Sequence, residues 1–211
     1  MKKPGVSKGE HTRAAILEQA VAVASQLGLE GLTIGTLAQR TGLSKSGLFA
    51  HFGSKEELQL ETLHAAQALF NTTVVQPARR ASRGLSRLTE FFQRWLNWTV
   101  SAQLPGGCLF AAGATEFDDR PGPVREALAN GLRQWRLTLI DTVRQAAQQG
   151  QLRADVDAEQ FVFELYGILL AAHNDGRLLG DSRAGSHAER AFARLVSSSL
   201  PATAVPPNPT H

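Results

Sequence analysis

The sequence has little of what several protein classes require. Its 211 residues include one cysteine, which excludes an internal disulfide and, with no export signal at the start of the chain, favours a reducing cytoplasm. No apolar run approaches the roughly 20 residues that a membrane-spanning helix needs, so we expect no membrane partner. No Ser/His/Asp set, phosphate-cradling glycine loop or HExxH motif occurs. We therefore expect neither an enzyme nor a bound cofactor.

The net charge is also small, at +3, but it is unevenly placed along the chain. Residues 1–55 contain seven Lys/Arg and three Glu, an excess of four positive charges, whereas the remaining 156 residues carry a net charge of −1. All of the positive excess therefore lies in the first quarter of the sequence. Such an imbalance is typical of a segment that binds a polyanion.

The most informative stretch is residues 33–52, which read TIGTLAQRTGLSKSGLFAHF. Two short helical patterns flank Gly42, where a tight turn requires a positive φ. Thr33 and Ser44 each stand immediately before one of these patterns, as N-caps do. Leu43, just after the turn, is expected to pack into the core. The spacing predicts a helix-turn-helix.

The second of these two helices has a narrow, polar and positive N-terminal turn. Lys45, Ser46 and Gly47 face outward from it, whereas Leu48 and Phe52 are spaced to face inward. A helix end of this kind suits the major groove of DNA, where phosphates bind free N–H groups and small polar side chains reach base edges. The alternative is a helical hairpin that binds no partner, because isolated patterns of this kind are often false matches.

Helical patterns also lie on both sides of this motif. A first helix is expected to begin near Thr12 and to end at Gly28. Ser54 and Glu57 form a capping box that opens a fourth helix, which continues into the mid-seventies. Lys55 lies in the first turn of that helix, where a cation is unfavourable to the helix dipole unless a phosphate binds there.

Residues 12–70 resemble the N-terminal domain of the TetR family of bacterial transcriptional repressors. Several positions of TRAAILEQAVAVASQLGLEGLTIGTLAQRTGLSKSGLFAHFGSKEEL match the family together and at fixed spacing. The resemblance implies a three-helix DNA-binding unit followed by a fourth, linking helix. It also implies a set of residues that contact bases or the DNA backbone, namely Thr33, Thr41, Ser44, Lys45, Ser46, Gly47, Leu48, Phe49, His51 and Lys55.

One short segment departs from the family pattern. Many members have Leu-Tyr-x-Tyr/His-Phe where this chain has Leu-Phe-Ala-His-Phe, at residues 48–52. Phe49 lacks the phenol that often bonds a phosphate in relatives, and Ala50 removes another polar contact. The methyl group of Ala50 can still meet a thymine methyl, and His51 is expected to take over the phosphate contact.

Five further helices are expected after a basic break at residues 77–83. Their aromatic side chains recur at helical spacing, which is typical of a core but also of the apolar wall of a ligand pocket. The candidate ligand-binding residues are Phe91, Trp95, Trp98, Cys108, Phe110, Trp135, Phe163, Tyr166 and Leu170. His64 and His173 are further groups that could hydrogen-bond a ligand.

Cys108 has two interpretations. It lies near the N-terminus of a short helix, a position that lowers the pKa of a thiol and suits a redox sensor. Without a second cysteine to resolve an oxidised one, a small buried hydrophobe is the favoured alternative. His173, Asn174 and Asp175 are adjacent on one helix and do not converge as metal ligands must, so we expect no metal site.

The helix that begins after Asp157 is apolar nearly all the way round, so it must be covered on two sides. One cover is its own domain, and the other is most simply a second subunit. The C-terminal half is similar to the regulatory domains of TetR-like proteins, in which the last two long helices form a dimeric four-helix bundle. The candidate dimer-interface residues are Phe161, Leu165, Leu169, Ala172, Phe192 and Leu195.

Together these patterns predict an all-α protein of about nine helices, with a three-helix helix-turn-helix DNA-binding domain and a larger helical ligand-binding and dimerisation domain. The expected divisions are a flexible basic arm (1–11), the DNA-binding domain with its linking helix (12–75), the second domain (76–200) and a disordered Pro-rich tail (201–211). The expected function is that of a cytoplasmic, homodimeric repressor that binds a palindromic double-stranded DNA operator and is released by a small hydrophobic effector. The alternative is an architectural or division-control protein on the same fold that binds DNA without an effector.

Overall fold

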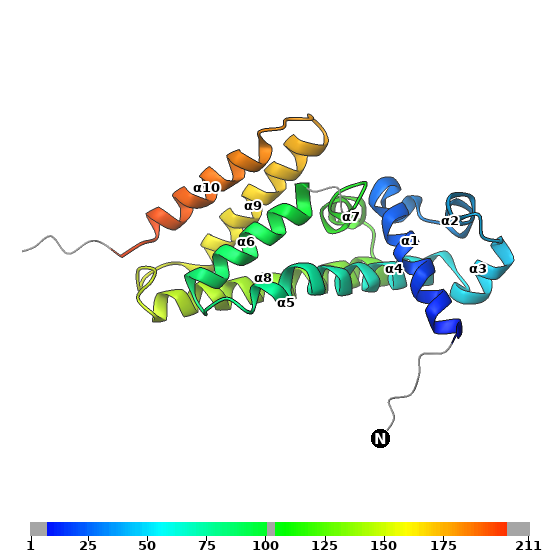
Figure 1. Cartoon of the computed structure of the whole chain (residues 1–211), viewed down its shortest axis with the longest axis horizontal. Coiled ribbons are helices and arrows are strands. Elements are labelled where there is room, and N and C mark those ends of the chain that lie inside the picture. Colours follow the sequence, from blue (N-terminus) through cyan, green and yellow to red (C-terminus); the bar gives the residue numbers. More distant parts are fainter. Residues whose placement is uncertain (1–7, 101–103, 202–211) are drawn as a thin grey trace, which may run out of the picture.

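The computed structural model describes residues 8–100 and 104–201, and every regular element in these two ranges is helical (Figure 1). The elements are α1 (Lys8–Gly31), α2 (Ile34–Thr41), α3 (Lys45–Phe52), α4 (Lys55–Phe70), the π-helical η1 (Asn71–Val75), α5 (Gln76–Ala78), α6 (Leu85–Val100), α7 (Leu109–Phe117), α8 (Pro123–Gln148), α9 (Ala158–Arg177) and α10 (Ala184–Ser198). Because α4, η1 and α5 follow one another without a break, the described residues form nine helical segments. The predicted all-α fold is confirmed. None of these helices is long and apolar enough to cross a membrane.

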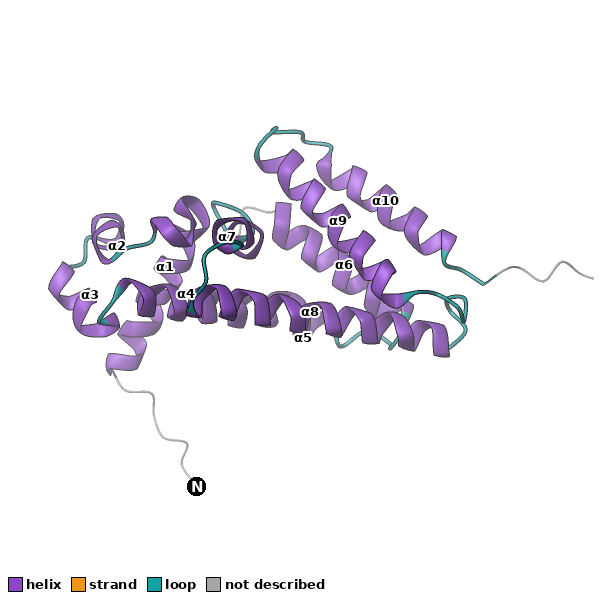
Figure 2. Ribbon diagram, turned by 180° about the vertical axis from the view of Figure 1, so that it is seen from behind, coloured by secondary structure: helices purple, strands orange, loops and turns teal. Residues whose placement is uncertain are grey.

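The helices form a small head and a larger body (Figure 1). The head consists of α1, α2, α3 and the first turns of α4, and the body contains α6, α8, α9 and α10. The long α4–α5 helix runs from the head along the body, beside α8. Seen from behind in Figure 2, α7 lies at the junction, where it packs against both α1 and α8. One helix therefore touches both parts of the molecule.

Most helix boundaries follow the local signals in the sequence, but two starts differ from the prediction. α1 begins at Lys8, four residues before Thr12, so residues 8–11 of the predicted flexible arm are helical. The spacing of Ser186 and Glu189 predicts an N-cap at Ser186, but α10 begins at Ala184, and the Ser186 hydroxyl donates to the Arg183 carbonyl (2.9 Å) from inside the helix. The remainder of the predicted arm (1–7) and residues 202–211 of the predicted tail lie outside the described residues.

Two glycines end their helices as the sequence predicts. Gly28 has φ of 77°, so the regular part of α1 stops there and residues 29–31 form a separate turn. The second is Gly150, where the pattern that opens at Pro123 predicts the end of a long helix; it follows α8 with φ of 69°. Both conformations lie in the left-handed region, which glycine adopts without the penalty that a Cβ imposes.

Candidate DNA-binding surface and ligand cavity

The helix-turn-helix is built by reciprocal local hydrogen bonds. The Thr33 hydroxyl accepts from the Thr36 amide (3.0 Å), and the Thr36 hydroxyl accepts from the Thr33 amide (2.8 Å), which closes a capping box at the start of α2. Gly42 then adopts φ of 71°, and its amide donates to the Ala38 carbonyl. Ser44 caps α3 by accepting from the Gly47 amide (3.1 Å). These contacts confirm the predicted caps and turn, and they fix the direction in which α3 leaves the head.

One face of α3 is buried and the other is free. Leu48 and Phe52 are fully buried beneath the helix, whereas Lys45, Ser46, Gly47 and Phe49 are exposed on its outer side. Phe49 is 59% exposed although it is a large apolar residue. The exposed turn thus combines a cation, a hydroxyl and an aromatic ring on one surface, which can meet phosphate, base edges and thymine methyl groups.

Two residues of the motif are placed differently from the prediction. Leu48 was included among the DNA-contacting residues, but its side chain is 1% exposed and belongs to the head core. Leu43 was expected in the core, but it is 42% exposed, because the left-handed turn at Gly42 directs it outward. Thr41 is half-buried, and its hydroxyl donates to the Leu37 carbonyl (2.7 Å) within α2.

Arg13 positions α3 from the outside, a role that the sequence pattern did not reveal. Its guanidinium donates to the His51 carbonyl (2.8 Å), pairs with Glu61 of α4 (3.2 Å) and lies over the Phe52 ring at 5.1 Å. A single side chain of α1 therefore ties the C-terminal end of α3 to α4. An arginine at the polar edge of the first helix gives no sign of these long-range contacts in the sequence.

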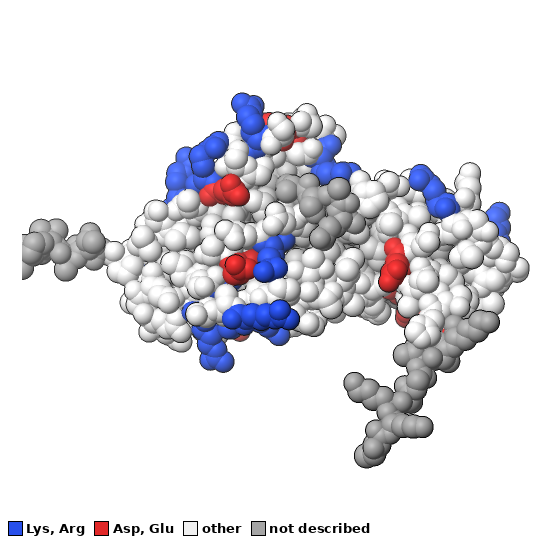
Figure 3. All heavy atoms as spheres, in the orientation of Figure 1, with Lys and Arg blue, Asp and Glu red and all other residues white. Residues whose placement is uncertain are grey.

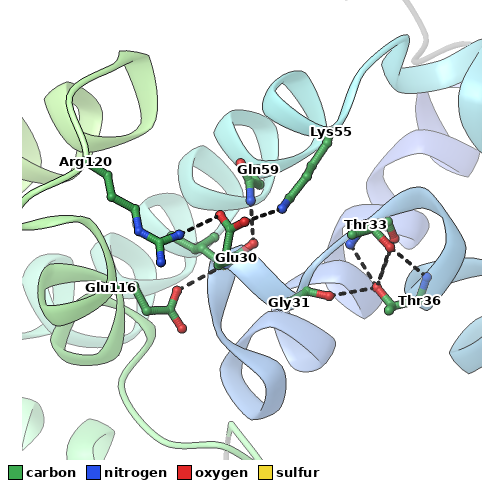
Figure 4. Close-up of polar contacts among 9 residues, drawn as sticks. Glu30, Gly31, Thr33, Thr36, Lys55, Gln59, Glu116 and Arg120 are labelled. Atoms are coloured by element: carbon green, nitrogen blue, oxygen red, sulfur yellow. Dashed lines mark hydrogen bonds and ion pairs between the residues drawn. The ribbon is translucent and has the colours of Figure 1, made fainter.

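A polar network joins the head to the body at the corner between α1 and α2 (Figure 4). Lys55, in the first turn of α4, donates to the Glu30 carboxylate (2.6 Å), and Arg120 from the turn after α7 pairs with the other oxygen (3.4 Å). The Glu30 amide donates to the Glu116 carboxylate of α7 (3.1 Å), and Gln59 of α4 donates to the Leu29 carbonyl (2.6 Å). The network thus connects three elements, and it holds Lys55, a predicted phosphate contact, on a carboxylate.

Replacing Glu30 with Gln should make this junction insensitive to acid. The hydrogen bond from Lys55, followed by the nearby charges of Lys55 and Arg120, lowers the pKa of Glu30 below its ordinary value. The carboxylate therefore stabilises the fold above the ordinary pKa of a glutamate, and this contribution is lost as the pH falls through the lowered pKa of the folded state. Since the partners are largely exposed, we expect a loss of below about 1 kcal/mol at pH 7. Thermal unfolding of both proteins from pH 7 to 3.5 should show the difference between them shrink; a constant difference would contradict this account.

Two glycines lie where the body packs so closely against α1 that an added Cβ would displace a neighbouring group, a movable side chain at Gly28 and the backbone at Gly106. A Cβ at Gly28 would lie 1.6 Å from the Glu116 carboxylate, and one at Gly106 would lie 1.5 Å from the Ser25 carbonyl oxygen. The Gly106 amide also donates to the Ser25 hydroxyl (3.0 Å), which is itself buried. Both ends of α7 are therefore held against the last turns of α1.

The body encloses a cavity of about 700 Å³ between α4–α5, α6, α7, α8 and α9. Its inner wall is largely aromatic. The rings of Phe70 and Trp95 pack edge-on with the ring of Trp135 in this wall, and Phe91 packs edge-on with Trp135 from behind it, with centroids 5.2–5.3 Å apart. A cavity of this size and composition is typical of a site for an organic molecule.

Two polar stripes form the mouth of this cavity. One runs along the α4–α5 helix and the other along α8, which lies beside it. The two helices touch at Gly131, where a Cβ would lie 2.6 Å from the Gln67 side-chain nitrogen and would displace that side chain. The stripe on α4–α5 contains His64, Gln67, Asn71 and Arg79, and the stripe on α8 contains Glu126, Asn130, Gln134 and Thr138.

A proline explains why the cavity wall includes a π-helix. Pro77 has no amide hydrogen, so the carbonyl four residues before it cannot form the usual helical bond. In η1 the register shifts, and the Gln76 amide donates to the Asn71 carbonyl five residues earlier. Asn71 and Val75 of this segment line the cavity. π-helical turns are rare in proteins, and those that occur are often found at functional sites.

The predicted ligand-binding residues divide into three groups. Phe91 and Trp98 lie one layer behind the wall, where Phe91 contacts Trp135, and Trp98 contacts Phe70 and Phe110. Phe163 was expected in the pocket but is 64% exposed on the outside of α9, because the helix turns it away from the body. The remaining six line the cavity: Trp95, Cys108, Phe110, Trp135, Tyr166 and Leu170.

Cys108 and His173, both on the inner wall, are not expected to carry a charge at neutral pH. Burial raises the pKa of the Cys108 thiol above its ordinary value, which opposes the thiolate that a sensor cysteine needs. Burial, followed by the nearby Arg177, lowers the pKa of His173. The inner wall of the cavity at these two residues is therefore uncharged, and for Cys108 the interpretation as a small buried hydrophobe is favoured over that as a sensor.

Comparison with known families identifies the fold. A family model described as "Bacterial regulatory proteins, tetR family" matches residues 16–62, and one described as "Tetracyclin repressor-like, C-terminal domain" matches residues 84–192, more than half of the chain. The chain belongs to the TetR family. It is thus a transcription regulator with a DNA-binding helix-turn-helix and a ligand-binding C-terminal domain.

Individual relatives agree with this assignment. The HTH-type transcriptional repressor AcnR of Corynebacterium efficiens is 30% identical over 162 residues, which cover 75% of this chain and 77% of AcnR. A TetR regulator from Chloroflexus aurantiacus has a TM-score of 0.79 at 26% identity, covering 90% of this chain and 94% of that one. AibR, solved in complex with isovaleryl coenzyme A and operator DNA, has a TM-score of 0.67 at 23% identity, covering 90% and 98%.

In this TetR-family regulator, the face of α9 that is left exposed differs from the prediction. All six residues proposed for the dimer interface are 8% exposed or less within one chain: Phe161, Leu165, Leu169, Ala172, Phe192 and Leu195. The apolar side chains that α9 leaves exposed are Phe163, Leu170 and Ala171, with Gly167 between them; Leu170 also lines the cavity, so it lies at the edge of this face. At helical spacing these lie on roughly the opposite side of the helix from the buried set. The prediction that α9 is apolar on two sides is confirmed. The residues predicted to meet the partner, however, lie on the side that packs within the same chain.

Proposed function

We propose that this TetR-family regulator is a homodimeric repressor that binds a palindromic operator and is released by a small organic effector. The observation that supports this most directly is the free N-terminal turn of α3, where Lys45, Ser46 and Gly47 are exposed while Leu48 and Phe52 lock the opposite face. A rigid helix with a polar, positive end is what a major groove accepts.

The contacts with DNA divide into two kinds. Lys45, Ser46 and Gly47 meet base edges, where a lysine can bind guanine acceptors and a serine can bind either edge. Thr33, Ser44, Phe49 and His51 meet the backbone and set the register of the head without specifying sequence. Lys55, which donates one hydrogen bond to Glu30 (2.6 Å), has further hydrogens to donate to a backbone phosphate. Thr41 is half-buried on α2, and its contribution to DNA binding is its position beside the turn.

Dimerisation places two heads on one face of the DNA. The exposed apolar face of α9, together with α10, is the surface we assign to the second subunit, because a two-fold axis there pairs α9 and α10 of both chains into four helices. Two recognition helices then enter successive major grooves, about 34–36 Å apart. A near-palindromic operator follows from this symmetry.

Release requires a connection between the cavity and the head. The cavity is lined by Cys108, Phe110 and Ala111 at the start of α7, and α7 holds the end of α1 through Glu116. It is also lined by α4, which leads directly into the head. A ligand that binds better when α4 and α7 are displaced shifts the population toward dimers whose two heads are wrongly spaced for the operator. AibR offers a precedent for one fold that holds a small molecule and operator DNA together.

The double variant Lys45→Ala/Ser46→Ala tests the DNA contacts. Each lost base contact costs about 1–3 kcal/mol and the loss occurs in both subunits, so we expect operator affinity to fall by about 100-fold or more. The assay is fluorescence anisotropy with the DNA upstream of the protein's own gene, at two salt concentrations and with unrelated DNA as competitor.

Arg80→Ala is the matched control, because it removes one positive charge from an exposed site in the body, far along the α4–α5 helix from the head. It should bind the operator as the wild type does. Wild-type affinity in the double variant, or weak binding that ignores sequence, would contradict the proposal.

A further inference from the structure

The mouth of the cavity carries opposite charges at its two ends. Among the described residues that line it, Arg79 is the one arginine or lysine and Glu126 is the one carboxylate. His64 and Arg79 lie 15 residues apart on one continuous helix, which corresponds to about 22 Å. Glu126 lies at the start of α8, at the other end of the mouth, and the rim between the two ends holds amides and hydroxyls. The mouth of the cavity is therefore long, uncharged in its middle and positive at the α5 end.

Arg79 belongs to a cluster of basic side chains. Arg79, Arg80 and Arg83 fall within five residues at the end of α5, and all three are exposed. In the part of the chain that the structure describes, none of their guanidinium groups forms an ion pair or a hydrogen bond with another residue. Figure 3 shows basic side chains gathered along the lower edge of the molecule, where this end of the body lies. These charges are available to a ligand.

The nearby arginines are already committed. The Arg136 guanidinium lies over the Tyr166 ring at 4.8 Å, and Arg87 donates to the carbonyls of Arg79 and Ala81. Arg87 thereby fixes the backbone at Arg79 and leaves the Arg79 side chain free. Arg79 is thus the cation that the fold presents to the cavity.

We infer that the effector of this regulator is an elongated, amphipathic organic anion, whose carboxylate or phosphate binds Arg79 while its apolar body lies in the aromatic cage. The inference rests on the proposed function of the cavity as the effector site. The aromatic wall accepts a flat or aliphatic body, and a guanidinium binds both acidic groups through paired, charge-assisted hydrogen bonds. Arg177, the cation beside His173, donates to the Pro105 carbonyl (2.8 Å) and does not line the cavity, so the acidic group binds at the rim.

The test uses a pair of probes that differ only in charge. Pyrenebutyrate and pyrenebutanol share a flat apolar body, and only the first carries a carboxylate. The chain has three tryptophans, and all of them lie at the cavity or one layer behind it. Tryptophan fluorescence, quenched by energy transfer to pyrene, therefore reports binding of the probe, and the comparison of Arg79→Ala with Arg80→Ala tests whether the probe lies in this cavity.

We expect pyrenebutyrate to bind the wild-type protein about tenfold more tightly than pyrenebutanol, because a charge-assisted hydrogen bond contributes more than a neutral one. Arg79→Ala should abolish this preference and leave the affinity for pyrenebutanol unchanged. Arg80→Ala removes the same charge from a neighbour that does not line the cavity, and it should keep the preference. Higher salt should weaken the preference in the wild type.

Displacement of pyrenebutyrate by dodecanoate or dodecyl phosphate identifies the acidic group, which is the one carried by the tighter competitor. Equal affinity for the two pyrene probes, or an equal loss of preference in Arg79→Ala and Arg80→Ala, would overturn the inference while leaving the cavity as an effector site. Failure of both probes to quench the tryptophans would overturn both. If pyrenebutyrate binds through Arg79 but leaves operator affinity unchanged, the anion site stands and the proposed release mechanism is wrong.

Discussion

Gly106→Ala is expected to lower the free energy of unfolding by about 3 kcal/mol, at the upper end of the cost of overpacking. The added methyl group would lie 1.5 Å from the Ser25 carbonyl oxygen and 1.9 Å from its carbon. Both are backbone atoms, so no side chain can rotate away. The loop must retreat from α1, and the hydrogen bond from the Gly106 amide to the Ser25 hydroxyl is then lost as well. For a chain of this length the midpoint of thermal unfolding should fall by roughly 6–12 °C.

Gly185→Ala is the control for this variant. Gly185 lies in α10, and a Cβ there would meet nothing within 4 Å. Since alanine favours a helix more than glycine does, we expect a gain of about 0.5–1 kcal/mol. The two midpoints should be measured at one protein concentration, because dimerisation makes them concentration-dependent. A Gly106→Ala midpoint indistinguishable from that of the wild type would show that the loop is not held tightly against α1.

The importance of Gly106 follows from the position of α7. The loop before this helix is fixed to Ser25, its last turn is fixed to Gly28 and Glu30 through Glu116, and its first turn faces the cavity. A ligand that moves α7 therefore displaces both attachments at the end of α1. The head can respond as one body because Arg13 binds α3 to α1 and α4.

The sequence predicted those features that depend on residues three or four apart. The caps at Thr33, Ser44 and Ser54, and the left-handed Gly42, were all identified correctly. In each case a side chain or a missing Cβ acts on its own backbone, so the local pattern contains the cause. The long, strongly periodic helices were predicted for the same reason.

The two apolar sides of α9 show where periodicity stops being informative. The pattern shows that the helix is apolar on both sides, but it cannot tell which side meets the same chain. Phe161 was therefore assigned to the partner and Phe163 to the pocket, whereas Phe161 is buried within the chain and Phe163 is exposed. The choice between the two sides depends on where α6, α8 and α10 pack against α9, and those helices are distant in the sequence.

Other features that depend on packing between distant segments were missed altogether. Apart from His64, the polar rim of the cavity was not predicted, because Gln67, Gln134 and Arg79 have the pattern of ordinary solvent-facing helix positions. Polar side chains at such positions are mostly exposed in proteins, so nothing in the pattern indicates the mouth of a cavity. The close approach of Gly106 to Ser25 likewise joins residues 81 positions apart, and neither segment alone contains its cause.

Phe163→Glu is expected to convert the dimer into a monomer and to reduce operator affinity by more than about 100-fold, because one head alone reads only half of a palindromic site. Phe163 is 64% exposed within one chain, so a charge there leaves the protomer folded. In the proposed dimer the same side chain is buried against the partner, where an unpaired carboxylate is costly. Light scattering after size-exclusion chromatography gives the mass, and circular dichroism checks that the helices remain.

Leu137→Glu is the matched control, since Leu137 is also a large apolar residue, 50% exposed, but lies on α8 and outside the proposed interface. It should remain dimeric and bind the operator as the wild type does. Two outcomes would reject the α9 face as the interface: a Phe163→Glu protein that stays dimeric at low micromolar concentration, or a Leu137→Glu protein that dissociates equally. A monomeric Phe163→Glu protein with full operator affinity would instead keep the interface and reject the two-headed mode of DNA binding.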